Sequence, residues 1–540
     1  MADQNSSNRG RSEAEDSPTN GTVEEEVQHG AFVNALGLIG KLAGPSFLVL
    51  VMRLYGPDVY GVYATSYALV ETALALLSSG FKDASMMYVS RHAEDPSEHR
   101  QLYQSLANAL AWSLGAAGLV LLATFTIGPW VIPELYEYGD RLLFMIQWMA
   151  LALPFMAFER VVIAATQGLK IMKYESFING GVRPVLLLVV ASLMWLVAPN
   201  IWGLTLTYVS TQGFIALLAL GVYQRELRWG PLVQAFRTFE LQRELLSFAL
   251  PQNLNQAFER FLTNVDVVML GMFGVSARLT GFYSAGAQVV RELRHIKLVF
   301  SSAYAPHIPR LYQSGNRADL GRTLAVTSRW IASLVIPALL GLAVLRTDIL
   351  QLIEPSFGAR EALFMLWLLP IPYLQGSFGL AGNAVVMTGN SHLNLMNSVV
   401  TGTTNVLLNV WLIPLLGTVG AAVASSVSNL VKAIMEVGEM RLLLKIPIIA
   451  RVLYPPHAAG AVCAMGLGAA MSSTAWMTSG LWTRIGLAAG SMVAFVGVLS
   501  LLQGHLPRMP ALLRDDDSPE APADEEPTED APASVASRDD

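Results

Sequence analysis

The sequence predicts an all-α integral membrane protein with about fourteen transmembrane helices, arranged as two six-helix lobes and a C-terminal helix pair. Three observations predict this fold class: an apolar composition, a series of apolar segments long enough to cross a bilayer, and an internal repeat. Of the 540 residues, 53% are hydrophobic and only 14% are charged, and the mean hydropathy is +0.45. These values are too apolar for an ordinary water-soluble protein.

Apolar segments of roughly 20 residues, the length that spans a hydrocarbon core of about 30 Å, recur along the chain. We place fourteen of them, at 31–52, 59–80, 102–127, 143–166, 176–198, 201–222, 246–272, 280–305, 327–346, 361–388, 393–414, 418–437, 452–473 and 481–503.

Both ends of the chain are acidic and contain few large apolar residues. Segments 1–30 and 511–540 carry net charges of −5 and −9, so the total of −6 leaves +8 for the body between them. Such segments cannot bury enough apolar surface to order themselves, and we expect disordered, solubilising tails in preference to partner-binding ones. The first 30 residues lack the features of a cleaved signal peptide, so the first apolar segment should direct insertion.

Basic residues are unequally distributed between the two sets of connections. The connections after the second, fourth, sixth, eighth and twelfth segments hold sixteen Lys and Arg residues, against six in the opposite set. This positive-inside bias predicts a multi-pass protein of the cytoplasmic (inner) membrane with both termini in the cytoplasm. The outer connections are short and leave no external domain.

An internal repeat is present at an offset of 220 residues. G-V-Y-A at 61–64 matches G-F-Y-S at 281–284, L-F-M at 143–145 matches 363–365, and, near the same offset, Gln167-Gly168 resembles Thr388-Gly389. The repeat defines an N-lobe at 31–222, a basic linker at 223–245 and a C-lobe at 246–437, with the helix pair at 452–503 outside it. Parallel repeats of this kind form a cleft between lobes, where transporters bind their substrates.

The tetrapeptide A-F-E-R occurs twice, at 157–160 and 257–260, but its copies are 100 residues apart and do not follow the repeat. At the repeat offset, Glu159 corresponds to Gly379. The same offset relates Glu71 to Arg291, so equivalent positions in the two lobes carry opposite charges. We therefore expect an electrically asymmetric cleft.

Several segments resemble elements of bacterial and archaeal polysaccharide exporters. R-L-Y-G-P-D-V-Y-G at 53–61 is similar to their R-x-L-G-P-x-x-Y-G element, and D-V-V-M-L-G at 266–271 with G-F-Y at 281–283 is similar to their D-x-x-x-L-G and G-x-Y elements. Further similar stretches lie at 305–315, 388–394, 405–409, 412–414 and 417–422. Over roughly 31–440, the chain thus resembles the oligosaccharide flippase branch of the multidrug/oligosaccharidyl-lipid/polysaccharide (MOP) exporter superfamily.

This resemblance implies fourteen helices in two bundles and translocation of a lipid-linked, usually pyrophosphate-bearing oligosaccharide from the inner to the outer leaflet. Such transport serves cell-surface polysaccharide synthesis, as in O-antigen and lipopolysaccharide production. The implied partners are the lipid-linked oligosaccharide, membrane lipid and a polysaccharide polymerase or ligase, with no nucleic acid. The acidic tails are not part of the family pattern, and the sugar is not identified.

A cationic cluster lies on the predicted helix 280–305. Arg291, Arg294 and His295 are three to four residues apart and so share one face. Intramembrane charges are costly against lipid, and arginine binds phosphate oxygens through paired donors. We expect a headgroup phosphate site, most strongly at Arg291. The alternative is a set of anchors at the cytoplasmic end of the helix.

The predicted helix 246–272 carries a polar stripe that we expect to line the cleft. It consists of Gln252, Asn255 or Gln256, Glu259, Thr263 and Asp266. Glu259 is a candidate for proton coupling or for binding sugar hydroxyls, with local pairing to Arg260 or a neighbouring base as the alternative. Asp266 is a candidate for ion coupling or a structural cap.

Charges in three other predicted helices complete the candidate set. Lys41 and Glu71 lie in the middle of predicted spans and are cleft candidates, with a mutual structural pair as the alternative. Glu71 is also a candidate for ion coupling. For Glu159 and Arg160 we expect an ion pair between helices in preference to a binding site.

The sequence contains no phosphate-binding G-x-x-x-x-G-K-[ST] loop and no metal-binding motif, so we expect no cofactor, no metal and no ATP hydrolysis. An ion gradient, the membrane potential or downstream removal of product would drive transport. The alternatives are a lipid II flippase, a drug/cation antiporter and a membrane glycosyltransferase or polymerase. An enzyme would require a large acidic outer loop, whereas the outer acidic cluster at Glu134, Glu137 and Asp140 lies in a short one, so no catalytic residue is assigned.

Overall fold

The computed structural model describes residues 43–93, 98–304, 307–472 and 480–503, and within these ranges all regular secondary structure is helical. This confirms the all-α class. The two tails and Lys41 lie outside the described residues.

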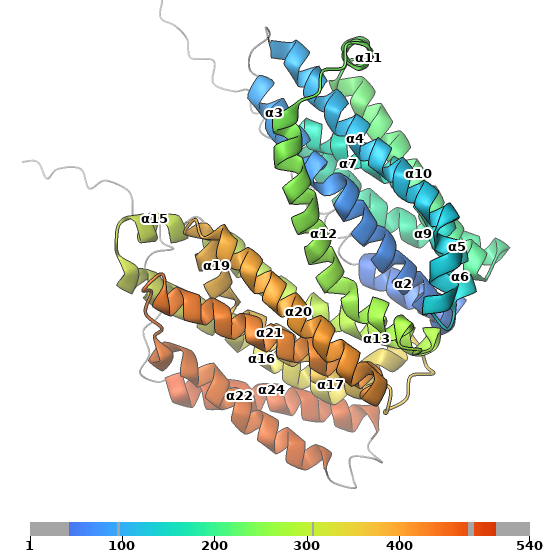
Figure 1. Cartoon of the computed structure of the whole chain (residues 1–540). Coiled ribbons are helices and arrows are strands. Elements are labelled where there is room, and N and C mark those ends of the chain that lie inside the picture. The colour runs from blue at the N-terminus through green and yellow to red at the C-terminus, as the bar shows by residue number, and fades with distance from the viewer. Residues whose placement is uncertain (1–42, 94–97, 305–306, 473–479, 504–540) are drawn as a thin grey trace, which may run out of the picture.

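The first half of the chain forms one helical bundle, with two helices extended through π-helical turns (Figure 1). The first helix, Ala43–Tyr55, precedes α2. The others are α2 (Pro57–Leu74), continued by η1 (Ala75–Ser79) and α3 (Gly80–His92); α4 (His99–Thr126); α5 (Gly128–Leu135); α6 (Gly139–Ala150); α7 (Leu153–Gly168); α8 (Lys173–Phe177), continued by η3 (Ile178–Val182) and α9 (Arg183–Val197); and α10 (Ile201–Glu226).

The second half begins after a short linker helix, α11 (Trp229–Arg237). Its helices are α12 (Arg243–Met272), α13 (Ala277–Glu292), α14 (Arg294–Tyr304), α15 (His307–Gln313), α16 (Arg317–Ile353), α17 (Leu363–Leu368), α18 (Pro370–Ser377), α19 (Gly379–Met387), α20 (Ser391–Leu416), α21 (Thr418–Leu442), α22 (Ala450–Met471) and α24 (Leu481–Gln503). The last two pack on α16 and on each other.

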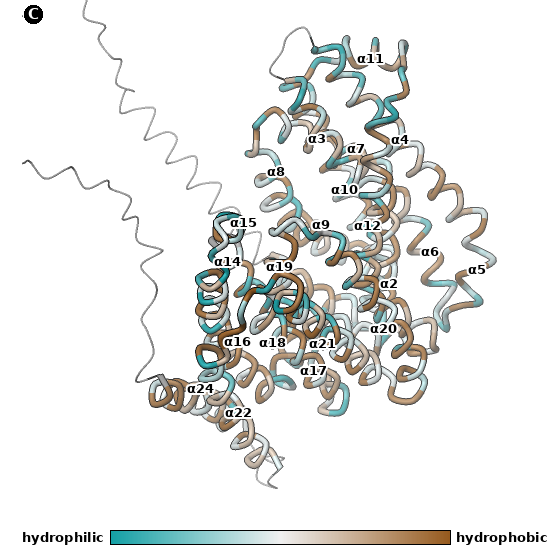
Figure 2. Tube along the Cα trace, turned by 60° about the vertical axis from the view of Figure 1, so that its left-hand side comes forward, coloured by the Kyte–Doolittle hydropathy of each residue, from teal (hydrophilic) through white to brown (hydrophobic). Residues whose placement is uncertain are grey.

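Seven helices of the described ranges are long and apolar enough to cross a membrane, or nine if two bent pairs each form one span. These pairs, α6 with α7 and α17 to α18 with α19, bend by 41° and 46°. A membrane protein is therefore confirmed, but the predicted count of fourteen spans is not. Breaks and polar residues facing the bundle interior shorten the apolar stretches. Hydrophilic residues gather at α11, α14 and α15 (Figure 2).

The two bundles form a V that is closed where α2 contacts α13 and open toward α11 and α15 (Figure 1). Helix α12 belongs by sequence to the second half but lies along α2, η1 and α3 of the first bundle, and it also contacts α20. It therefore borders the space between the bundles.

Two glycines related by the 220-residue repeat permit the close approach of α2 and α13. A Cβ atom at Gly61 would lie 1.7 Å from the carbonyl oxygen of Ala277, and one at Gly281 would lie 2.4 Å from that of Pro57. Nearby, the Arg53 guanidinium donates hydrogen bonds to the carbonyls of Leu352 (2.6 Å) and Ile353 (3.3 Å), at the end of α16. These contacts join the bundles at one end.

The turns that follow α7 and α19 share one geometry, but not at the positions that the sequence match aligned. Lys170 and Gly389 each have positive φ angles, 64° and 89°, and the next residue in each case donates to a carbonyl five positions earlier. The structural partner of Gly389 is thus Lys170 and not Gly168. A glycine usually occupies such a position, which explains the misalignment.

Candidate functional site

Two adjoining cavities, of about 410 and 400 Å³, lie in the second bundle among α12, α13, α14, α18, α20 and α21. We call them together the C-lobe cavity. The residues that line both are polar or cationic: Arg291, Arg294, Gln375, Asn429 and Lys432. The cavity therefore offers charge and hydrogen-bond donors within an apolar bundle.

The cationic cluster lies at a break between α13 and α14. Arg291 lies in the last turn of α13, whereas Arg294 and His295 begin α14, and all three line the C-lobe cavity. The Arg294 Nε donates to the Arg291 carbonyl at 3.3 Å, and His295 Nδ1 lies 3.2 Å from a Glu292 carboxylate oxygen. The structure thus brings the three predicted residues to one surface.

The polar stripe of α12 divides between two surroundings. Glu259, Thr263 and Asp266 line the C-lobe cavity. By contrast, Gln252 donates to Asp83 of α3 at 3.1 Å. Gln256 is half-buried and does not line the cavity. Only the later half of the predicted stripe therefore reaches this site.

Asp266 joins four helices. Its carboxylate accepts hydrogen bonds from Ser425 (2.5 Å), Tyr283 (2.6 Å), Asn409 (2.9 Å) and Asn405 (3.3 Å). Because these donors come from α13, α20 and α21, Asp266 does not act as a cap of its own helix, which continues to Met272. The four bonds tie α12 to its three neighbouring helices.

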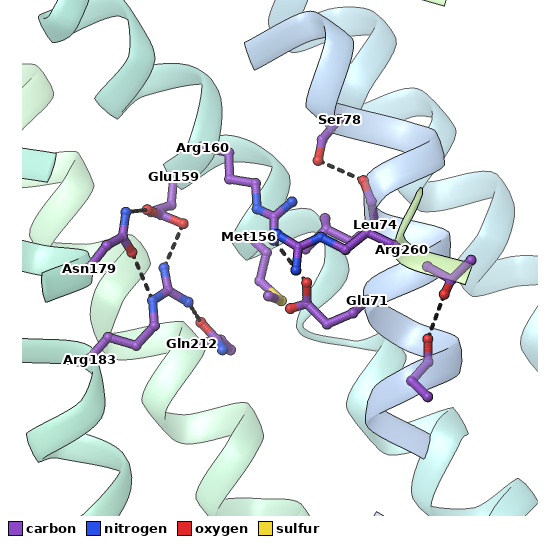
Figure 3. Close-up of polar contacts among 12 residues, drawn as sticks. Glu71, Leu74, Ser78, Met156, Glu159, Arg160, Asn179, Arg183, Gln212 and Arg260 are labelled. Atoms are coloured by element: carbon purple, nitrogen blue, oxygen red, sulfur yellow. Dashed lines mark hydrogen bonds and ion pairs between the residues drawn. The ribbon is translucent and has the colours of Figure 1, made fainter. Parts of the chain in front are cut away.

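A second set of charges lies in the first bundle (Figure 3). Arg160 of α7 pairs with Glu71 of α2 at 3.1 Å, and Arg183 of α9 pairs with Glu159 of α7 at 2.8 Å. Glu159 and Arg160 therefore each bind a different helix. Figure 3 also shows Arg260 of α12 reaching toward the Glu71–Arg160 pair. Adjacent Glu259 lines the C-lobe cavity instead, so the two charges have different neighbours.

The Arg183 guanidinium completes a network around Glu159, which is only 1% exposed. It also donates to Gln212 at 2.5 Å and to Asn179 at 2.9 Å. The charges of the first bundle are thus compensated by neighbours, and Glu71 is bound to Arg160 within it. Its repeat equivalent, Arg291, faces the C-lobe cavity.

The sequence reasoning missed four charged residues: Arg183 in the first bundle and Lys297, Lys432 and Glu436 at the C-lobe cavity. Their signal was present, because each lies in or at the edge of a predicted span, where charges are rare. Lys432 and Glu436 are also four residues apart on one helix, a spacing typical of ion pairs.

The two-bundle architecture is the fold of solved transporters of the MOP superfamily. The structure superposes on the lipid II flippase MurJ in an inward closed conformation, with a TM-score of 0.69 and 12% identity over 88% of this chain and 100% of MurJ. It also superposes on an inward-facing multidrug resistance MATE family transporter of the MOP superfamily, with a TM-score of 0.58 and 14% identity over 75% and 95% of the two chains. At these identities, the likeness concerns the fold.

Residues 27–312 match the family described as polysaccharide biosynthesis protein, and the chain belongs to that family. It is 25% identical to the probable flippase AglR of Haloferax volcanii over 403 residues, which cover 73% of this chain and 79% of AglR. It is also 25% identical to the probable low-salt glycan biosynthesis flippase Agl15 of the same organism, over 37% of this chain and 42% of Agl15. These relatives support a membrane flippase, a transporter rather than an enzyme.

Proposed function

We propose that this protein moves a lipid-linked, pyrophosphate-bearing oligosaccharide from the inner to the outer leaflet by alternating access between its two lobes. The observation that carries the proposal is the C-lobe cavity, with Arg291 and Arg294 on its wall. A sugar headgroup crosses hydrocarbon only with help, because each unpaired hydroxyl costs on the order of 2–7 kcal/mol. The cavity supplies polar partners while the lipid tail stays in the bilayer.

The pyrophosphate is proposed to bind at Arg291 and Arg294, because guanidinium groups donate paired hydrogen bonds to phosphate oxygens. Gln375 and Asn429, which line both parts of the cavity, supply partners for sugar hydroxyls. Arg260, which reaches toward the Glu71–Arg160 pair (Figure 3), is proposed to contact the headgroup outside the C-lobe cavity.

The proposed topology places both termini in the cytoplasm of an inner-membrane protein. In that topology the contact between α2 and α13 lies at the outer end and α11 and α15 lie at the inner end. The V of Figure 1 then opens inward, which is the state that receives substrate from the cytoplasmic leaflet. A polysaccharide polymerase or ligase would act on the transported product.

Glu259 is the favoured candidate for ion coupling among Glu259, Asp266 and Glu71. Asp266 already accepts four hydrogen bonds, and Glu71 is paired with Arg160. Glu259 is exposed and lines the cavity. An ion that enters the cavity can therefore reach its carboxylate.

A liposome assay tests the proposal. Purified protein is reconstituted with a fluorescent prenyl-pyrophosphate oligosaccharide, and an outside glycosidase reports the sugar's arrival on the far leaflet, with and without a pH gradient. Protein-dependent arrival is expected, and its dependence on the gradient would reveal proton coupling. Movement of cationic drugs in place of the glycolipid would favour the antiporter. Movement of lipid II alone would favour the lipid II flippase.

A further inference from the structure

Two further cationic side chains line the C-lobe cavity beside Arg291 and Arg294. Lys297 of α14 and Lys432 of α21 both line the cavity, together with Glu436 and Gly379. Lys297 lies six positions after Arg291 in the sequence, on the other side of the break between α13 and α14. A pyrophosphate whose oxygens are bound by Arg291 and Arg294 would leave the two lysines to bind another group.

Two glycines of α19 make room for the charged side chains. A Cβ atom at Gly379 would lie 2.6 Å from the Lys297 ammonium nitrogen, and one at Gly382 would lie 2.5 Å from a Glu436 carboxylate oxygen. Any larger residue at either position would displace these groups. The backbone of α19 thus provides space for a lysine and a glutamate side by side.

The charges of this region do not balance. Glu436 lies 3.9 Å from Lys432 and is the one carboxylate that lines this part of the cavity with the two lysines. With Arg291 and Arg294, which line the same part of the cavity, four cationic groups face one carboxylate, and a pyrophosphate would offset only part of this excess. An uncompensated charge within a membrane-embedded bundle is costly, and a bound anion would offset that cost.

We propose that Lys297 and Lys432 form a second anion subsite, which binds an anionic substituent of the glycan, either a sugar carboxylate or a sugar phosphate. This inference rests on the proposed function, because it assumes that the pyrophosphate occupies Arg291 and Arg294. Gln375 and Asn429, whose side chains are 3.4 Å apart, lie in both parts of the cavity and contact the sugar between the two anionic groups. The preferred substrate is thus an acidic oligosaccharide.

Three synthetic probes test the subsite: farnesyl-pyrophosphate disaccharides that end in glucose, glucuronic acid or glucose 6-phosphate. Their binding to the purified full-length protein in phosphatidylcholine nanodiscs is measured by calorimetry. The wild-type protein is expected to bind the two acidic probes about tenfold more tightly than the neutral one, as for one charged hydrogen bond. A preference for only one acidic probe identifies the substituent as carboxylate or phosphate.

The variants Lys297→Gln and Lys432→Gln are each expected to bring the ratio of acidic to neutral affinity toward one. Lys432→Arg, which retains the charge, should retain the ratio. Arg291→Gln should weaken the binding of all three probes and leave the ratio of acidic to neutral affinity unchanged. The matched control is Lys173→Gln, because Lys173 is exposed in the first bundle and its loss should change neither affinity nor ratio. Elution volume and thermal midpoint identify misfolded variants.

Equal affinity of the wild-type protein for all three probes would overturn the subsite, as would an unchanged ratio in both lysine variants. In either case, the proposed function would stand if Arg291→Gln weakened the binding of all three probes. Absence of binding of any probe to the wild-type protein would overturn both.

Discussion

Gly281 of α13 lies directly against Gly61 of α2, so that a Cβ atom on Gly281 would be only 3.0 Å from the Gly61 amide nitrogen. The two residues occupy equivalent positions in the two repeats. The lobes therefore meet through the same residue of each copy, at the closed end of the V.

Gly281→Ala should impair this closure, because the added methyl group would overlap the Pro57 carbonyl oxygen at 2.4 Å. Overpacking of this kind costs about 1–3 kcal/mol. We expect a lower thermal midpoint and reduced glycolipid transport. Gly118→Ala on α4 is the matched control, since a Cβ atom there meets nothing within 4 Å. Equal behaviour of the two variants would show that the α2–α13 contact does not require glycine.

Arg160→Ala should destabilise the first bundle, because it leaves the buried Glu71 carboxylate without its ion-pair partner. Breaking a buried pair on one side costs about 3–5 kcal/mol, so the yield of folded protein and its thermal midpoint should fall. The control is Arg100→Ala, whose pair with Glu240 is exposed on both sides and should contribute little. Simultaneous replacement of Glu71 and Arg160 by Leu and Met should recover stability. Unaltered stability in Arg160→Ala alone would contradict the assigned role.

Asp266→Asn should weaken the junction of α12, α13, α20 and α21, because the amide presents donors toward hydroxyl and amide groups that now donate to the carboxylate. Hydrogen bonds to charged groups each contribute about 1.5–3 kcal/mol. We expect a larger fall in thermal midpoint than for Tyr283→Phe, which removes only the 2.6 Å bond. The reverse order would indicate that Asp266 does not organise this junction.

The topology can be tested with single cysteines in a Cys463→Ala background, since Cys463 is the chain's one cysteine. Arg237→Cys on α11 and Glu137→Cys before α6 are both exposed positions. In intact cells, an impermeant thiol reagent should label position 137 but not 237, and permeabilisation should expose the latter. Labelling of 237 alone would reverse the proposed orientation.

Much of the helical framework was predictable, because bilayer thickness fixes span length and apolar segments therefore locate the helices. The repeat offset also pairs Gly61 with Gly281, the two residues that meet where α2 contacts α13. The turn after α7 was misaligned because Lys170, a residue that seldom adopts positive φ, occupies the position held by Gly389 in the second copy.

The pairing of charges was less predictable. The sequence placed Glu71 within a span but offered Lys41 as its partner, whereas the structure gives it Arg160. Helix rotation and tilt, which bring α7 beside α2, are set by tertiary packing and not by hydrophobic periodicity. Lys297 and Lys432 are likewise far apart in the sequence and become neighbours only when α14 and α21 line one cavity.

The most direct test of the central claim is the rate of glycolipid transfer in proteoliposomes containing Arg291→Gln, compared with wild-type protein and with the exposed control Arg237→Gln. All three proteins are first matched for reconstituted amount and thermal midpoint. The account predicts that Arg291→Gln reduces transfer of the prenyl-pyrophosphate oligosaccharide at least tenfold, roughly the loss of one charge-assisted hydrogen bond, while the control transfers normally. Wild-type transfer by folded Arg291→Gln would contradict the C-lobe cavity as the phosphate site.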